Sequence, residues 1–155
     1  MHQLSRRLFL TALTPLVGLA CCGALSAAEN RASGKRVALS GYDPVSYFTD
    51  GRPEKGSGEF TFAFDDAMYW FKNSEHRAMF ARDPERYAPQ YDGYCAISVS
   101  SGAGARTESD PEAWAIAEGK LYVFSGKGGP AKFAQHSDGI VSKANANWQA
   151  LRKAP

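Results

Sequence analysis

The sequence has little cysteine and no long uninterrupted apolar run. Three cysteines are present in 155 residues, and two of them, Cys21 and Cys22, lie close to the N-terminus. If the first 28 residues are removed, Cys95 remains alone, and one cysteine cannot form a disulfide within the chain. The fold therefore has to be stabilised by packing and not by sulfur bridges.

An excess of charge of one sign is also missing. Of the eighteen basic residues, Arg6 and Arg7 lie within the first 28 residues, which leaves sixteen basic and sixteen acidic residues in the rest of the chain. Binding to nucleic acid or to an anionic membrane surface needs clustered positive charge. This balance argues against both, and we expect no nucleic-acid partner.

Residues 1–28 have the three parts of a cleaved export signal: a charged start, a short apolar run over 12–25 and a small-residue exit at 26–28. The start matches the twin-arginine pattern. The matching residues are Ser5, Arg6, Arg7, Phe9 and Leu10. The apolar run is too short and too interrupted to span a bilayer comfortably. We expect the twin-arginine translocation machinery as a partner, a periplasmic location, and no integral membrane span after cleavage.

Two alternatives for this segment stay open. It can remain attached as an N-terminal membrane anchor. Alternatively, Cys21 or Cys22 can carry a lipid, because the small-residue pair Leu19-Ala20 precedes them.

After a flexible leader over 29–40, the pattern predicts one domain over 41–150. The alternation of Phe60, Phe62 and Phe64 with small or polar residues predicts a strand with three rings on one face. Asp65-Asp66 predicts a hairpin turn into a second strand over 68–71. Asn73 and Ser74 are typical of a helix start, and the spacing predicts a helix over 75–82.

Further along, the apolar alternation over 95–99 predicts a strand, and 113–116 and 121–124 predict a hairpin joined at Glu118-Gly119. A short helix is expected from Pro130 through Phe133, and a last helix over 142–152. No internal repeat is visible. The expected fold class is α+β: a single small domain with an antiparallel, hairpin-rich sheet packed with short helices.

The residues over 41–148 resemble the YHS domain family, in particular its longer, exported bacterial members. The first block that carries the resemblance is GYDPVSYF at 41–48, and the second is the aromatic strand and helix over 69–80. The third runs from Asp83-Pro84 through the Gly-Tyr-Cys-Ala of 93–96. Similarities at 110–114 and 143–148 extend it.

This resemblance implies heavy-metal handling, with a copper or other transition-metal ion as the cofactor, held mainly by cysteines. In this chain the corresponding positions are Ser46, Lys72 and His76. Serine is a poor ligand for a soft metal, and a lysine ammonium repels a cation. Of the three, His76 alone keeps coordinating ability.

From donor chemistry, the metal-ligand candidates are His76, Met79 and Cys95, since imidazole, thioether and thiolate all suit copper(I). His76 and Met79 are three residues apart on one expected helix, so both can face one side, although the same spacing describes a packed inner face. The glycine runs over 101–104 and 126–129 lack the spacing of a phosphate-binding loop.

The functional hypothesis is an exported, non-enzymatic YHS-like module that binds a metal ion or a small ligand. The alternative is a metal-free interaction or scaffold domain that meets an envelope protein through an aromatic face near Trp70 or through the loop over 100–110. A third interpretation, accessory thiol chemistry at Cys95, needs a histidine beside it, and no local pattern ties one to it.

Overall fold

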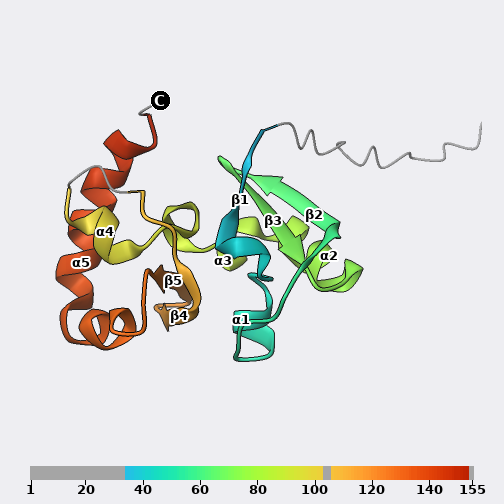
Figure 1. Cartoon of the computed structure of the whole chain (residues 1–155), viewed down its shortest axis with the longest axis horizontal. Helices are drawn as coiled ribbons and strands as arrows, with labels where there is room; N and C mark the ends of the chain where they lie inside the picture. The colour runs from blue at the N-terminus through green and yellow to red at the C-terminus, as the bar shows by residue number, and fades with distance from the viewer. Residues whose placement is uncertain (1–33, 103–105, 154–155) are drawn as a thin grey trace, which may run out of the picture.

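Two β-hairpins, each followed by a helix, organise the described part of the chain (Figure 1). The structure is a computed structural model and describes residues 34–102 and 106–153. The segment predicted to be an export signal, with the cysteines at 21 and 22, lies outside these residues. In chain order the elements are β1 (Arg36–Val37), the 3₁₀ turn η1 (Ala38–Gly41), α1 (Ser46–Thr49), β2 (Ser57–Phe64), β3 (Ala67–Phe71), α2 (Ser74–Arg82), α3 (Pro84–Tyr87), the 3₁₀ turn η2 (Gln90–Gly93), α4 (Ala96–Ser100), β4 (Asp110–Ala117), β5 (Lys120–Phe124) and α5 (Gly129–Leu151).

The first hairpin forms as the alternating phenylalanines predict. β2 pairs antiparallel with β3, and β1 adds to the other edge of β3 in parallel. Rings from both strands of the hairpin surround Phe80 of α2, which is fully buried. The ring centroids of Tyr69 and Phe71 lie 5.0 and 5.1 Å from that of Phe80, and the centroid of Phe62 lies 5.7 Å away. This face of the sheet and the inner face of α2 therefore make one core.

The predicted helix over 75–82 is confirmed as α2. Asn73 caps it, because its side chain accepts a hydrogen bond from the main-chain N–H of His76 at 2.8 Å. Asp83 ends this helix and caps the next, α3, with Pro84 in its first turn.

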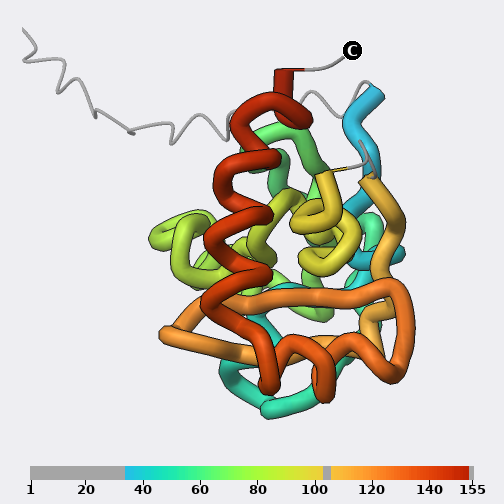
Figure 2. Tube along the Cα trace, turned by 90° about the vertical axis from the view of Figure 1, so that its left-hand side faces the viewer, coloured from blue at the N-terminus to red at the C-terminus, as the bar shows by residue number. Residues whose placement is uncertain are grey.

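The second hairpin, β4 and β5, is also confirmed, but the helix after it is longer than expected. The two short helices predicted from Pro130 and over 142–152 are parts of one helix, α5. Its continuity is interrupted only by a non-helical residue, His136, at φ −139°. Figure 2 shows α5 upright beside α4 and crossing the hairpin near its lower end.

The strand predicted over 95–99 is wrong. These residues enter the short helix α4, and Cys95 precedes its first residue. A run of five residues is too short for alternation to distinguish a strand from a helix that buries two positions one turn apart. Ala96 and Val99 are the two buried residues of α4, and this spacing is helical.

The sequence shows no repeat, but two parts of the structure have the same order of elements. Residues 36–82, the first unit, and residues 89–151, the second unit, each contain a 3₁₀ turn, a short helix, a β-hairpin and a longer helix, in this order. Each begins with a left-handed turn: φ is 53°, 50° and 80° at Leu39, Ser40 and Gly41, and 57°, 52° and 81° at Tyr91, Asp92 and Gly93. Figure 1 shows the two units beside each other along the long axis.

The hydrogen bonds after the two turns correspond as well. The main-chain N–H of Asp43 donates to the carbonyl of Glu54, and that of Cys95 donates to Thr107, both at 2.9 Å. Each hairpin then has an irregularity at the same place, between Ser57 and Thr61 in β2 and between Asp110 and Trp114 in β4. Bulges of this kind bend a strand in a specific way.

The hairpin of the second unit joins the two cores into one domain. Because side chains alternate along a strand, Leu121 and Val123 of β5 pack into the core of the first unit, whereas Tyr122 and Phe124 pack against α4 and α5. This arrangement confirms a single small α+β domain.

A second contact between the units is made by Tyr47 of α1. Its ring lies edge-on to Trp114 of β4, with centroids 5.2 Å apart, and its hydroxyl donates to the carbonyl of Pro111 at 3.0 Å.

The leader was expected to extend through residue 40, but the packed chain begins earlier. Ala38 and Leu39 are fully buried, and Arg36–Val37 already pairs with β3. Their short apolar stretch is part of the core and not of a flexible leader.

Candidate functional site

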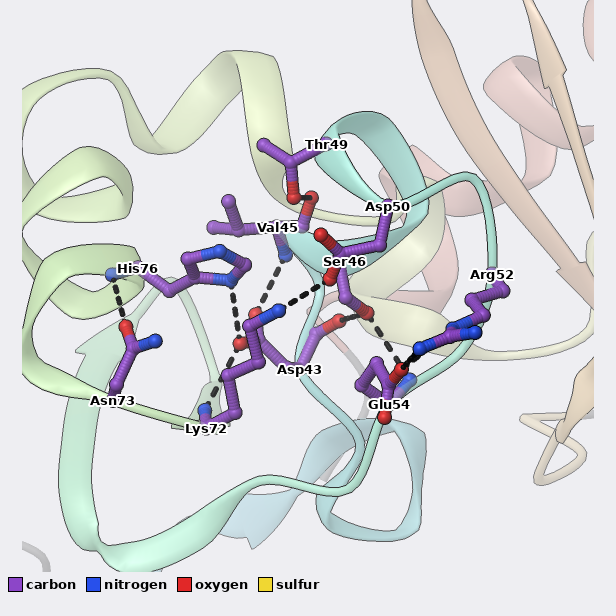
Figure 3. Close-up of polar contacts among 10 residues, drawn as sticks. All are labelled: Asp43, Val45, Ser46, Thr49, Asp50, Arg52, Glu54, Lys72, Asn73 and His76. Carbon is purple, nitrogen blue, oxygen red and sulfur yellow. Dashed lines mark hydrogen bonds and ion pairs between the residues drawn. The ribbon is translucent and has the colours of Figure 1, made fainter.

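Asp43 lies at the centre of the polar network of the first unit (Figure 3). Its side chain is fully buried and accepts three hydrogen bonds. Oδ1 accepts from the main-chain N–H of Val45 at 2.8 Å, and Oδ2 accepts from the main-chain N–H of Lys72 at 2.9 Å. The third donor is Nδ1 of His76, 2.8 Å from Oδ2. A buried carboxylate needs such donors, since burial without them is costly.

The local sequence explains why Asp43 points inward. The bond from its carboxylate to the N–H two residues ahead is an Asx turn, which Asp-Pro sequences favour. Ser46 reinforces the turn: its hydroxyl donates to the carbonyl of Asp43 at 2.7 Å and accepts from the N–H of Glu54 at 3.2 Å. The turn, α1 and the loop before β2 are thereby held together.

His76 reaches Asp43 because Asn73 fixes the first turn of α2. The imidazole is buried, with 8% of its side chain exposed. A carboxylate can only accept, so Nδ1 is the donor, and Nε2 is left as the nitrogen that can bind a metal ion or receive a proton when the ring is neutral.

The charged groups around this network are paired. Nζ of Lys72 lies 2.5 Å from Oδ2 of Asp50, and Arg52 contacts Glu54 at 2.6 Å. The ion pair with Asp50 partly neutralises the ammonium that would otherwise repel a cation near His76.

The three predicted metal-ligand residues do not form one site. Met79 lies one turn after His76 on α2, is half-buried, and packs against the core of the first unit. Cys95 belongs to the other core cluster, beside α5. Figure 1 places α2 and α4 on opposite sides of the molecule. No group of three or more His, Cys, Asp or Glu residues within 34–102 and 106–153 is arranged to hold a metal ion.

Cys95 has its own surroundings in the second unit. It is 2% exposed and lies at a cavity of about 260 Å³ that the glycine-rich loop over 125–129 also lines. Burial raises the pKa of this thiol, but hydrogen bonds with Ser98 and Ser125 outweigh burial and hold the pKa below its ordinary value. Neither His76 nor His136 is among the residues that line this cavity.

Sequence reasoning treated Asp43 as a turn residue and missed its role as the acceptor for His76. The signal was present in the Gly-Tyr-Asp-Pro stretch, where an Asp before Pro favours a carboxylate that accepts a hydrogen bond from the main chain. Its partner, 33 residues later, could not be read from local pattern.

Comparison with known proteins adds no match: no family model, curated protein or solved structure is similar to this chain. Across the described ranges, no helix combines the length and the apolar character that crossing a bilayer requires.

Proposed function

We propose that the protein is a non-enzymatic, YHS-like module that binds a transition-metal ion or a small ligand through the imidazole of His76. The observation that carries this proposal is the 2.8 Å contact between Nδ1 of His76 and the fully buried carboxylate of Asp43. Histidines that bind metals usually donate their other ring N–H to such a group, which fixes the tautomer and makes the remaining nitrogen more basic.

The family resemblance supports the place of the site. Ser46, Lys72 and His76 are the positions at which the compact relatives would carry cysteine. In this chain all three contact Asp43, through the serine hydroxyl, the lysine main chain and the imidazole. Positions far apart in sequence therefore meet around one carboxylate.

The residues present do not fit the cysteine-rich metal site that the resemblance implies. Serine and a lysine paired with Asp50 replace two soft ligands, and no third donor joins His76 among the described residues. What remains is one oriented imidazole, because the side chain of Met79 packs against the core of the first unit. Such a donor set suits an ion that keeps other ligands or a small molecule that needs a hydrogen-bond acceptor.

The test is titration of the purified chain with copper(I) and with zinc(II), together with elemental analysis. His76→Asn keeps an N–H in the place of Nδ1 and removes Nε2, so its fold should persist by circular dichroism. We expect binding of one ion by the wild type and a loss of affinity of at least about tenfold in this variant.

His136→Asn is the matched control, because His136 is an exposed histidine on α5. It should bind as the wild type does. If the wild type binds no ion in stoichiometric amount, or if His76→Asn binds equally well, the metal part of the proposal is wrong.

We also propose that the module acts in the periplasm after twin-arginine export. Changing Arg6 and Arg7 together to lysine should leave the protein in the cytoplasmic fraction, with its signal uncleaved. Normal export of this variant would contradict the proposal.

The interaction or scaffold role is the second candidate, and the surface gives it less support. Among the described residues, the exposed large hydrophobic is Ile116, at 39%. Trp70, offered as the centre of an aromatic face, is half-buried, and its ring lies across Gly41 and Gly58. Ligand binding therefore ranks first.

A further inference from the structure

Two adjoining cavities lie where the first unit meets α5. One has a volume of about 200 Å³ and the other about 490 Å³. They share three lining residues, Asp92, Trp148 and Arg152, so they are parts of one cleft. Neither includes His76 or Cys95, which makes this cleft independent of the site described above.

Asp92 is the unusual group in the cleft. It is 8% exposed, yet no donor among the described residues forms a hydrogen bond with its carboxylate oxygens. Its main-chain carbonyl, and not its side chain, accepts a hydrogen bond from Arg36. Ser40, the corresponding residue of the first unit, is exposed. A buried carboxylate that lines a cavity and lacks a donor is poorly satisfied unless something else supplies one.

The electrostatic consequence is visible in its pKa. Burial, with a smaller contribution from the charge of Asp65, raises the pKa of Asp92 to about 6, and Arg152 opposes the change. The charged and titratable groups that face this carboxylate or line the cleft around it are Arg36, Asp65, Asp66, Tyr69, Glu85, Tyr91, Tyr94, Arg106, Lys120 and Arg152.

The arginines of the cleft are already engaged. Arg36 pairs with Glu108 at 2.9 Å and stacks on the ring of Tyr94, 3.9 Å from its centroid. Arg152 pairs with Asp65 at 2.7 Å. Arg106 also has a partner. The group in need of a counter-charge is therefore the carboxylate and not a guanidinium.

A second buried polar atom senses the charge of the same carboxylate. The hydroxyl of Tyr69 has no hydrogen-bond partner among the described residues, and the side chain is 1% exposed. Burial raises the pKa of Tyr69, and the charge of Asp92 is the next cause, so the two groups sense each other.

We propose that this cleft binds a small organic cation whose N–H groups donate to Asp92 and whose flat part lies against Trp148. An ionised carboxylate without a donor selects for a charged N–H donor, and charge-assisted hydrogen bonds of this kind are strong. Trp148 lines both cavities, and the face of an indole ring attracts cations more strongly than other aromatic faces do. The tryptophan and the carboxylate come from α5 and η2, so the site exists only when the second unit is folded.

The experiment uses benzamidine, a planar cation that can donate two parallel hydrogen bonds to a carboxylate. Binding to the full chain is measured by calorimetry and by the shift of the Trp148 indole resonance. Benzoate, of similar size and opposite charge, and neutral benzamide are titrated in parallel. We expect benzamidine to bind with one-to-one stoichiometry and to shift that resonance, and the other two to bind at least about tenfold more weakly.

Asp92→Asn is the test variant, because asparagine tolerates the positive φ of this turn. It should weaken benzamidine binding at least about tenfold. Asp66→Asn removes an equal charge from an exposed residue of the same cleft and should change affinity less than about threefold. Wild-type binding should also weaken as the pH falls through about 6, while that of Asp92→Asn should not.

Tighter binding of benzoate would show an anion site on the arginines and overturn the proposal. Equal binding by Asp92→Asn, or no shift of the Trp148 resonance with any of the three probes, would overturn it as well. His76→Asn should bind benzamidine normally, so that a failure of this inference and a failure of the proposed function are distinguishable.

Discussion

Asp43 in the first unit and Cys95 in the second follow the same left-handed Gly-Tyr turn. Each lies beside the residue that follows the second strand of its hairpin: Asp43 accepts from the main chain of Lys72, and the thiol of Cys95 hydrogen-bonds with the main chain of Ser125. The shared backbone arrangement of the two units, called the frame below, thus places a hydrogen-bond-accepting side chain at the same position twice. In one unit a carboxylate uses it to hold His76, and in the other a thiol uses it beside a glycine-rich loop.

This comparison separates what the frame requires from what each unit adds. The frame requires a turn of positive φ, a hairpin with a bulge, and an inward acceptor. The first unit adds a histidine and a cluster of rings around Phe80, whereas the second adds the long helix α5 and the covered Asp92.

The largest effect is expected in the cores. Phe80→Ala removes the ring that four aromatic side chains contact and should lower the free energy of unfolding by about 3–5 kcal/mol. Phe133→Ala should cost a similar amount, because this ring is 2% exposed and packs on Tyr122 and Phe124.

Because β5 belongs to both cores, each variant should still unfold in one transition when urea denaturation is followed by circular dichroism. Two separate transitions would show that the units fold independently.

The next largest loss of stability is expected from substitution of Asp43 or Cys95, the two inward-facing acceptors. Asp43→Asn places an amide where main-chain and imidazole donors converge and should cost about 3 kcal/mol. Cys95→Ala removes a small buried thiol and should cost about 1–2 kcal/mol. Thermal or urea denaturation measures both. Equal costs would mean that the two side chains do the same structural work.

Substitutions in the two left-handed turns should have smaller effects on the free energy of unfolding. Gly41 and Gly93 have φ of 80° and 81°, which strains any other residue by about 1 kcal/mol or more. A Cβ at Gly41 would also lie 2.9 Å from a ring carbon of Trp70, whereas at Gly93 the nearest atom is 3.4 Å away. Gly41→Ala should therefore cost about 2–3 kcal/mol and Gly93→Ala about 1 kcal/mol. The reverse order in urea denaturation would contradict the assigned packing of Trp70.

The smallest effect concerns pH. Burial raises the pKa of Asp92 to about 6, above its value in the unfolded chain. Between the two values the folded chain keeps the proton that the unfolded chain has lost, so the free energy of unfolding falls as the pH rises from about 4 to about 6.

Asp92→Asn should remove this dependence and stabilise the protein at pH 7 by about 1 kcal/mol, with no gain at about pH 4. Ser40→Asp places a carboxylate at the exposed counterpart in the first unit and should create no such dependence. Urea denaturation across this pH range measures both. An unchanged pH profile in Asp92→Asn would show that another group is responsible.

Much of the fold was predictable because local sequence patterns specify several of its elements. Alternating phenylalanines specify β2, the Asn-Ser cap specifies α2, and the Glu-Gly turn specifies the second hairpin. The short element after Cys95 was not predictable, since five residues carry too little periodicity and the tertiary packing of Val99 against α5 decided the outcome. α5 was divided in the prediction because its centre holds Gly139 and exposed polar residues.

The repeat escaped sequence reasoning for a different reason. The two units share the Gly-Tyr pair and little else, because the frame is maintained by main-chain hydrogen bonds and by φ values that several residue types can adopt. His76 was identified as the best candidate, but its partner Asp43 and the covered Asp92 depend on contacts between distant segments.

The contact between Tyr47 and Trp114 makes Trp114 a fluorescent reporter of the junction between the two units. The Tyr47 ring of the first unit covers Trp114 of the second, and the other two tryptophans lie elsewhere, Trp70 on the first sheet and Trp148 at the cleft. Emission from a chain that retains only Trp114 would respond when the units separate, even if both hairpins stayed intact. A stopped-flow or single-molecule measurement on such a chain could time the joining of the two halves directly.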